Sequence, residues 1–359
     1  MSNERVIIFT GGGSGGHVVP GLTLINELQK DIRNKIYYIG SHQGIERSLV
    51  ENQKIPYYAI STGKLRRYLS LQNLLDIFKV FKGIWDAFWI LARFKRNRSL
   101  VFSTGGFVSV PVVLAAWFMG KKVFIHEQTS QVGLANKICS LFAQKIYISF
   151  EDSLKFFPSE KTEVSGYPLR EQLFNSSVGE LVISGVNIND ISKPILFITG
   201  GGNGSGLLND LVKKYLHELS KKYFIVHQVG KNYIEEFSKV ENENYLPLDF
   251  LNEGMIDLYK LSDTIISRAG AGTVCELLAL NKKSIFIPLK IAQRNEQYFN
   301  ALEAQKKLGS RIIEEDSLPS MDLLHYLQEF SNEDQSGDAQ LAVKNGTEFL
   351  RDEIQKVFS

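Results

Sequence analysis

Twice in this sequence a short run of β-branched and apolar residues ends in a cluster of glycines before a helical pattern resumes. The first run is Val6–Phe9, followed by the cluster Gly11–Gly16, and the second is Ile195–Ile198, followed by Gly200–Gly204. A buried strand that opens onto bare backbone amides at the start of a helix forms a cradle for an anion or a sugar diphosphate. Two such units predict two nucleotide-binding folds that face a shared cleft.

Strand-like runs alternate with helical ones along the chain, which is typical of parallel sheets with helices on both faces. The predicted strands are 5–10, 35–39, 57–60, 100–103, 122–125, 145–148, 194–198, 223–229, 245–248, 264–266 and 284–288. We therefore predict an α/β fold with two Rossmann-like domains. Residues 1–165 form the first domain, residues 166–339 form the second, and a helix within 340–359 packs back on the first. The joint lies near the weakly periodic stretch Gly179–Lys193.

Composition narrows the class of protein. The chain has 359 residues, of which 44% are apolar and 22% are charged, as in ordinary globular proteins. Its net charge of +2 disfavours a nucleic-acid binder. The two cysteines, Cys139 and Cys275, provide neither a disulfide framework nor a metal-binding spacing. The amino terminus lacks the pattern of a signal peptide, so we expect a cytoplasmic protein.

Other nucleotide-binding classes fit poorly. The spacing of Gly11, Gly13 and Gly16 matches the dinucleotide fingerprint, but the second strand ends in Gly40-Ser41-His42 without the acid that binds ribose. No Gly-Lys-Ser/Thr follows either glycine cluster, so a P-loop is excluded. No Asp-x-Asp triplet occurs, so the sequence does not require a metal-bound diphosphate, and we expect no metal and no cofactor.

Several motifs together resemble the bacterial MurG family of N-acetylglucosaminyltransferases (glycosyltransferase family 28). These motifs are Gly-Gly-x-Gly-Gly-His-x-x-Pro at residues 12–20, Gly105–Ser109, His126-Glu127-Gln128, Gly133–Lys137, Gly166-x-Pro168-x-Arg170 and Ser267–Thr273. Their order and spacing extend the resemblance over nearly the whole chain. It implies the two-domain GT-B fold, in which the carboxy-terminal domain holds the donor and the amino-terminal domain holds the acceptor.

The resemblance also implies a reaction. N-acetylglucosamine would move from UDP-N-acetylglucosamine to the C4 hydroxyl of undecaprenyl-diphosphate-linked N-acetylmuramyl-pentapeptide (lipid I), giving lipid II with inversion at the sugar. This step belongs to peptidoglycan synthesis, and through it to cell shape and division. Two alternatives stay open: a related GT-B transferase acting on a glycerolipid or another polyprenyl-diphosphate sugar, and a non-catalytic nucleotide-sugar-binding protein.

By resemblance, the donor contacts lie on both domains. The uracil would meet the backbone of Leu251, and Gln297 would bind sugar hydroxyls. Small residues before the helix that starts near Thr273 would let the diphosphate approach its amino terminus, and Glu276 could accept the ribose hydroxyls. The full predicted set is Ser14, Gly15, Gly16, Thr129, Arg170, Gly202, Leu251, Ala271, Gly272, Thr273, Val274, Cys275, Glu276 and Gln297.

Two residues are candidates for the base that takes the acceptor's proton. His17 stands where the first glycine loop meets its helix, and histidine side chains exchange protons near neutral pH. The alternative for His17 is a helix-start residue that binds a phosphate or caps the loop. Glu127 is the second candidate, and its alternative is a hydrogen-bond partner that orients the loop after Ile125. Arg170 and the helix dipole would stabilise the leaving group.

Residues 64–98 carry nine basic residues against two acids, with aromatic residues at helical spacing between them. Such a stretch suits an anionic lipid surface, and the alternative is a core helix with a solvated basic end. The predicted membrane contacts are Leu74, Phe78, Phe81, Trp85, Phe88, Lys79 and Lys82. We thus predict a peripheral protein on the inner face of the cell membrane. Its partners would be anionic lipids, the two substrates and other cell-wall synthesis proteins, with no nucleic acid.

Three positions depart from the family pattern. Gly202 stands where the family usually has a serine, Thr129 where many members have asparagine, and Glu296 in a segment that more often reads Gly-Asp-Gln or Gln-Gln.

Overall fold

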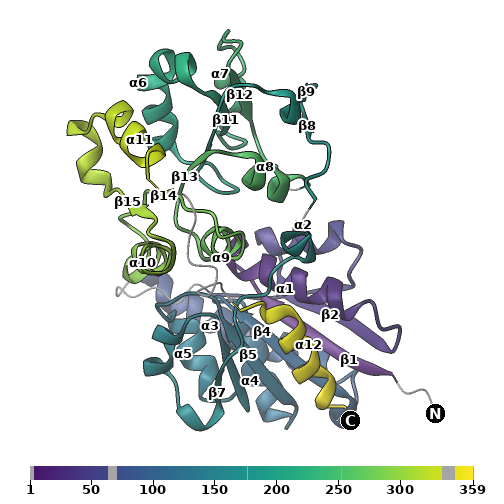
Figure 1. Cartoon of the computed structure of the whole chain (residues 1–359). Coiled ribbons are helices and arrows are strands. Elements are labelled where there is room, and N and C mark those ends of the chain that lie inside the picture. The colour runs from purple at the N-terminus through teal and green to yellow at the C-terminus, as the bar shows by residue number, and fades with distance from the viewer. Residues whose placement is uncertain (1–3, 64–70, 176, 252, 334–343, 359) are drawn as a thin grey trace. The chain divides into compact units, whose positions relative to one another are not determined.

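The computed structural model describes residues 4–63, 71–175, 177–251, 253–333 and 344–358. The chain forms two compact units (Figure 1). Unit 1 comprises Met1–Arg170 together with Lys344–Ser359, and unit 2 comprises Glu171–Val343.

Unit 1 is built on a seven-stranded sheet in the order β3-β2-β1-β4-β5-β6-β7, and every neighbouring pair is parallel. The strands are β1 (Arg5–Gly11), β2 (Asn34–Ser41), β3 (Tyr57–Ile60), β4 (Ser99–Gly105), β5 (Lys122–Glu127), β6 (Lys145–Ile148) and β7 (Thr162–Val164). The helices are α1 (Gly15–Leu28), α2 (Ile45–Asn52), α3 (Leu71–Leu91), α4 (Ser109–Phe118), α5 (Leu134–Ser140) and α12 (Gly346–Lys356). Short 3-10 turns η1 (Arg96–Arg98), η2 (Glu151–Phe156) and η3 (Ser159–Lys161) complete the unit.

Side chains of β1 alternate between two hydrophobic cores. Ile8 packs into one core with residues of α3, α4 and α5, whereas Ile7 and Phe9 pack into the other with residues of α1, α2 and α12. Alternation along a strand sends neighbouring side chains to opposite faces, so a sheet covered on both sides needs apolar residues at nearly every position. Figure 1 shows α12, in yellow, lying beside α1 on this sheet.

Unit 2 repeats the design with a six-stranded sheet in the order β12-β11-β10-β13-β14-β15, again parallel throughout. Its strands are β10 (Ile195–Thr199), β11 (Phe224–Gln228), β12 (Tyr245–Leu248), β13 (Thr264–Ser267), β14 (Ile285–Phe286) and β15 (Arg311–Ile312). Its helices are α6 (Gly206–Lys222), α7 (Ile234–Phe237), α8 (Met255–Leu261), α9 (Ala271–Ala279), α10 (Glu296–Leu308) and α11 (Leu323–Ser331). The turns η4 (Glu171–Phe174), η5 (Ile188–Asp190), η6 (Gln293–Asn295) and η7 (Glu315–Ser320) connect them.

A small antiparallel hairpin precedes the second sheet. Its strands β8 (Val182–Ile183) and β9 (Val186–Asn187) are joined by Ser184 and Gly185, both with positive φ. The sequence had indicated only a weakly periodic polar stretch here, because two-residue strands leave no measurable alternation.

Each glycine cluster occupies the same place in its sheet. The chain leaves β1 between β2 and β4, and leaves β10 between β11 and β13, so both loops lie where the strand order reverses. In open parallel sheets ligands bind at this position, beyond the carboxyl ends of the strands. The parallel two-sheet α/β fold predicted from the sequence is confirmed.

Candidate active site

Two glycine loops of unit 1 pack backbone against backbone. The amide of Gly12 donates to the carbonyl of Gly105 at 3.2 Å. A Cβ on Gly106 would lie 2.0 Å from the carbonyl oxygen of Gly12, and φ of Gly106 is +82°. A side chain at Gly106 would therefore force the loops apart.

A buried carboxylate, Glu46, holds the first loop in place. Its Oε2 accepts the Gly13 amide at 3.2 Å, and its Oε1 accepts both the amide (3.0 Å) and the hydroxyl of Ser41. Glu46 lies in the first turn of α2, where the helix dipole favours negative charge. A ribose-binding acid is absent from the end of β2, but an acid in the first turn of the next helix reaches back under the glycine loop.

The imidazole of His17 has a defined tautomer. Its Nδ1 lies 3.1 Å from the carbonyl oxygen of Thr104 and 3.2 Å from Oε1 of Gln128. Both partner atoms are acceptors, so Nδ1 carries the hydrogen and donates it. The neutral ring then has its lone pair on Nε2, which is the arrangement a general base needs.

The orientation of the Gln128 amide follows from a second histidine. Burial lowers the pKa of His126 to about 4, so this ring is neutral near pH 7. Its Nε2 lies 3.0 Å from the carbonyl of Gly166 and donates to it, which leaves Nδ1 to accept from Nε2 of Gln128 at 3.2 Å. The same amide nitrogen donates to the His126 carbonyl at 3.0 Å, so Oε1 of Gln128 faces His17.

Glu127 has both carboxylate oxygens engaged. Oε1 accepts the amide of Thr129 at 3.1 Å and its hydroxyl at 2.9 Å, and Oε2 accepts Nδ2 of Asn136 at 2.9 Å. The residue is only 2% exposed. This carboxylate fixes the loop after β5 to helix α5.

The open start of α1 lies beside these groups. Ser14 is the N-cap residue, and its side chain makes no capping hydrogen bond. Ser14 and Gly16 are exposed, Gly15 is partly exposed, and a Cβ on Gly15 would meet nothing within 4 Å. The first amides of a helix have no partner within the helix, so this end can receive an anion.

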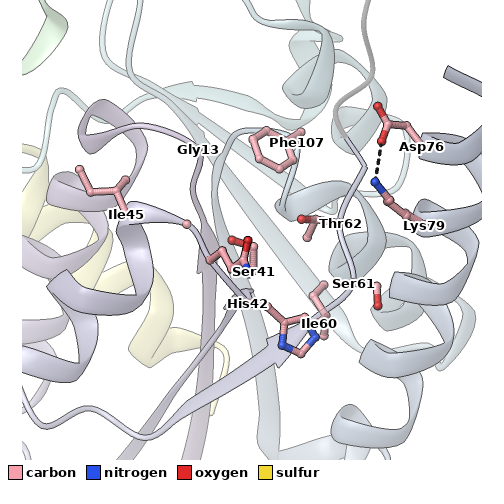
Figure 2. Close-up of a pocket in the computed structure, with 12 residues that line it drawn as sticks. Gly13, Ser41, His42, Ile45, Ile60, Ser61, Thr62, Asp76, Lys79 and Phe107 are labelled. Atoms are coloured by element: carbon pink, nitrogen blue, oxygen red, sulfur yellow. Dashed lines mark hydrogen bonds and ion pairs between the residues drawn. The ribbon is translucent and has the colours of Figure 1, made fainter. Parts of the chain in front are cut away.

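A pocket of about 680 Å³ opens on the other side of the first glycine loop (Figure 2). It lies beyond the ends of β1 to β4 and against α3. Its lining consists of Gly13, Ser41, His42, Gln43, Gly44, Ile45, Ile60, Ser61, Thr62, Asp76, Lys79 and Phe107.

In unit 2 the glycines of the loop after β10 differ in how closely other atoms approach them. Gly204, with φ of +73°, passes so near β11 that a Cβ would lie 2.0 Å from the carbonyl oxygen of Val229. A Cβ on Gly202 would instead meet only the ring of Phe250, at 3.5 Å. The loop thus presents the backbone at Gly202 to its surroundings.

Gln228 at the end of β11 links this loop to the segment after β12. Its Nε2 donates to the carbonyl of Gly201 at 2.9 Å, and its Oε1 accepts the amide of Leu251 at 3.2 Å. The amide of Leu251 is therefore engaged within the protein. The neighbouring Phe250 ring is 51% exposed.

Helix α9 begins directly after β13. The amide of Val274 is the first that bonds back, to the carbonyl of Gly270 at 3.0 Å, so the amides of Ala271, Gly272 and Thr273 form the open end. A Cβ on Gly270 would meet nothing within 4 Å. The helix start can therefore be approached closely by an anion.

Arg268, just before α9, makes hydrogen bonds to three other segments of unit 2. Its Nε donates to Oγ of Ser205 at 3.1 Å, and its Nη1 donates to the carbonyl of Ile287 at 3.0 Å and to Oε1 of Glu315 at 2.6 Å. The guanidinium is buried and paired with a carboxylate, so its role is to join three segments around the helix start.

The remaining predicted donor contacts differ in exposure. The side chains of Val274 and Cys275 are fully buried, and Glu276 is 8% exposed. Gln297, at the start of α10, accepts the amide of Leu289 through Oε1 at 3.0 Å. Arg170 ends the first segment of unit 1.

The sequence matches the Glycosyltransferase family 28 N-terminal domain over residues 7–148 and the Glycosyltransferase family 28 C-terminal domain over residues 195–357. The chain belongs to glycosyltransferase family 28. The C-terminal match runs through α12, although that helix packs on unit 1.

Relatives in family 28 are similar over almost their whole length. A protein of Bacillus cereus is 40% identical over 98% of this chain and 99% of its own length. It is named UDP-N-acetylglucosamine–N-acetylmuramyl-(pentapeptide) pyrophosphoryl-undecaprenol N-acetylglucosamine transferase 2. A protein of Clostridium tetani with the same name, without the numeral, is also 40% identical over 99% of both chains. The crystal structure of MurG from Acinetobacter baumannii matches with a TM-score of 0.70 and 25% identity, covering 98% of this chain and 99% of that one. The resemblance to the MurG family is confirmed.

Sequence reasoning missed three side chains that shape the site of this family 28 chain. Glu46 and Gln228 each hold a glycine loop, and Gln128 sets the tautomer of His17. Gln128 was visible within a quoted motif, but its contact with His17 spans 111 residues. No local sequence pattern predicts the role of Glu46, because its hydrogen-bond partner Gly13 lies 33 residues away in the sequence.

The aromatic residues of α3 form a stripe, defined as Phe78, Phe81, Trp85, Phe88 and Trp89. Their exposed fractions range from 36% for Phe88 to 66% for Phe81. Lys79 and Lys82 flank the stripe and pair with Asp76 and Asp86, each at 3.4 Å. The side chain of Leu74 and the basic residues Lys64, Arg66 and Arg67 lie outside the described residues. In the described part of the chain, no helix combines the length and the hydropathy needed to span a membrane.

Proposed function

We propose that this chain transfers N-acetylglucosamine from UDP-N-acetylglucosamine to the C4 hydroxyl of undecaprenyl-diphosphate-linked N-acetylmuramyl-pentapeptide. The names of its full-length relatives describe this transfer. The observation that carries the chemistry is the tautomer of His17, whose Nδ1 faces two carbonyl oxygens and whose Nε2 has the lone pair.

In the proposed step, Nε2 of His17 takes the proton of the acceptor hydroxyl while its oxygen attacks C1 of the donor sugar. The bond from C1 to the UDP oxygen breaks on the opposite face, so the product is inverted. His17 becomes an imidazolium, and its Nδ1 hydrogen keeps the two carbonyl partners, which stabilise the positive charge. Glu127 acts as a positioning residue, because its two oxygens already accept three protein donors.

We assign the donor to unit 2. The amides of Ala271, Gly272 and Thr273 would hold the diphosphate, and their dipole would stabilise the charge on the departing UDP. Leu251 would offer its carbonyl to the uracil, since its amide is engaged by Gln228. Glu276 would meet the ribose, and Gln297 and Gly202 would complete the site. The remaining predicted contacts, Ser14 to Gly16, Thr129 and Arg170, belong to unit 1.

A transfer assay tests the proposal. The purified protein is given UDP-N-acetylglucosamine and a short-chain lipid I analogue, and UDP release is compared with UDP-glucose, UDP-N-acetylgalactosamine and glycerolipid controls. We expect acceptor-dependent release from the N-acetylglucosamine donor alone. His17→Ala should lower kcat by 10²-fold or more while UDP binding is retained. Binding of UDP without turnover in the unmodified protein would refute an enzyme, and release with another donor or acceptor would refute this reaction.

The aromatic stripe of α3 would bring the enzyme to the membrane that carries its acceptor. Exposed aromatic side chains flanked by lysines fit the interface of an anionic bilayer. We propose that the enzyme works at the inner face of the cell membrane, and contacts with other cell-wall synthesis proteins stay a prediction of the family resemblance.

Sedimentation with vesicles tests the membrane contact. Binding to phosphatidylglycerol vesicles should fall at least tenfold in the double variant Phe81→Ser, Trp85→Ser. Ile32→Ser is the matched control, because Ile32 is 89% exposed and lies in the turn before β2 rather than on α3. Equal binding by the stripe variant and the control would refute the contact.

A further inference from the structure

The pocket lined by Gly13, His42, Thr62 and Lys79 has no task in the transfer step described above. We propose that it binds the peptide of the acceptor, an inference that rests on the proposed function. The pocket volume of about 680 Å³ lies within the usual range of about 300–1,000 Å³ for small-ligand sites.

Location is the first argument. The pocket and the base share one wall, because the ring of Phe107 packs so closely on Gly13 that a Cβ there would lie 2.5 Å from Cε1. On the other side of that wall, Cδ2 of His17 is 3.1 Å from the position of a Cβ on Gly106. In an N-acetylmuramyl acceptor the peptide starts from the lactyl group on C3, the carbon next to the reacting C4. A peptide whose sugar meets His17 therefore begins beside this wall.

Hydrogen-bonding capacity is the second argument. Within the described part of the chain, no hydrogen bond engages the side chains of His42, Gln43 and Thr62. Figure 2 shows Thr62 and His42 on the pocket lining, from the segments after β3 and β2. Imidazole, amide and hydroxyl groups both donate and accept, which matches the alternating N–H and C=O groups of a peptide.

Charge is the third argument, and it separates a peptide from a phosphate. Glu46 lies beneath the lining and takes up the Gly13 amide, so that amide cannot bind an anion. Asp76 is buried in the wall and pairs with Lys79 at 3.4 Å, as the dashed line in Figure 2 marks. Among the described residues at this pocket, two carboxylates against one paired lysine disfavour a diphosphate, whereas neutral peptide groups or an amine are accommodated.

The test compares two acceptors that differ only in peptide length. One lipid I analogue carries the pentapeptide and the other carries only its first alanine. Rates are measured for the full chain and for the double variant Gln43→Leu, Thr62→Val. Thr23→Val is the matched control, because Thr23 lies on α1, away from the pocket lining, and its hydroxyl donates to the carbonyl of Val19. Thermal unfolding checks that the variants fold.

We expect the unmodified chain to prefer the pentapeptide acceptor by about tenfold in kcat/KM. The double variant should lose most of this preference through slower reaction of the pentapeptide acceptor, with the single-alanine acceptor and the KM for the donor unchanged. Equal slowing of both acceptors, which would indicate that the pocket serves the sugar or the diphosphate, overturns the proposal. So does an unmodified chain that shows no preference. Failure to transfer to either acceptor would refute the proposed function itself, and the peptide site with it.

Discussion

Replacing Glu46 by glutamine tests whether one buried carboxylate organises the catalytic loop. The two side chains have the same shape, so Glu46→Gln removes the charge and one acceptor without opening a cavity. The amide oxygen can still accept both donors of Ser41, but its NH₂ group then faces the N–H of Gly13. That arrangement sets two donors against each other.

The structure gives the expected size of the effect. The carboxylate accepts three hydrogen bonds from Gly13 and Ser41, and it is fully buried. A hydrogen bond to a charged group contributes about 1.5–3 kcal/mol. Losing one of the three bonds should therefore lower the free energy of unfolding by about 2–3 kcal/mol. For a unit of this size, Tm should fall by roughly 4–12 °C.

Activity should fall for the same reason. The Gly13 backbone packs on Phe107, and the loop leads directly into His17, so a displaced loop moves the proposed base. We expect kcat to fall about tenfold or more. The KM for UDP-N-acetylglucosamine should change little, since the donor site is assigned to unit 2.

Differential scanning calorimetry and steady-state kinetics measure both effects. Glu51→Gln is the matched control, because Glu51 lies on the same helix, is exposed and pairs with Arg47 on the surface. If Glu46→Gln unfolds at the temperature of the control and turns over at the same rate, the carboxylate does not organise the loop.

Three further predictions concern other parts of the site. Burial lowers the pKa of His126 to about 4, from a value near 6.5 in the unfolded chain. The unfolded chain therefore binds this proton first, and the folded state loses about 3 kcal/mol of stability as the pH falls from about 6.5 to 4. Urea unfolding of His126→Asn should show a shallower loss of stability over that range, and an unchanged slope would contradict this prediction. Gln128→Leu removes one of the two acceptors of His17 Nδ1, so kcat should fall about tenfold at constant KM, and nitrogen NMR should detect a second His17 tautomer. A single tautomer with a normal rate would show that Gln128 does not set the tautomer of His17. Gly202→Ser should change the free energy of unfolding by less than about 0.5 kcal/mol, because the new Cβ meets only the Phe250 ring, at 3.5 Å. The added hydroxyl should leave the affinity for UDP unchanged or raise it, as isothermal titration with UDP can check.

Much of the fold follows from local pattern. Val6–Phe9 and Ile195–Ile198 are apolar at every position because both faces of each sheet are covered, and the glycines follow where the backbone must pass close to a neighbour. Strands β7 and β15 were not predicted, since three residues or fewer carry no period. The hairpin around Ser184 and Gly185 was missed for the same reason.

The site was less predictable than the fold. Motif order indicated His17 and Glu127, but not which nitrogen of His17 holds the proton. That depends on Gln128 and, through it, on His126, whose own tautomer is set by the carbonyl of Gly166. The hydrogen bonds of Gln128 to His17 and of His126 to Gly166 join residues that only the folded sheet brings together, so no sequence spacing predicts them.

The path of the chain has a consequence for how unit 1 is made. Leu350 and Ile354 of α12 are fully buried in a core with Leu24 and Phe124, and Tyr147 donates to Glu353 at 3.0 Å. During synthesis this core stays incomplete until all of unit 2 has left the ribosome. In the nascent chain, unit 1 therefore keeps an apolar face uncovered, and chaperones bind surfaces of this kind. Lesions in α12 should accordingly reduce the yield of folded protein before they change its catalysis.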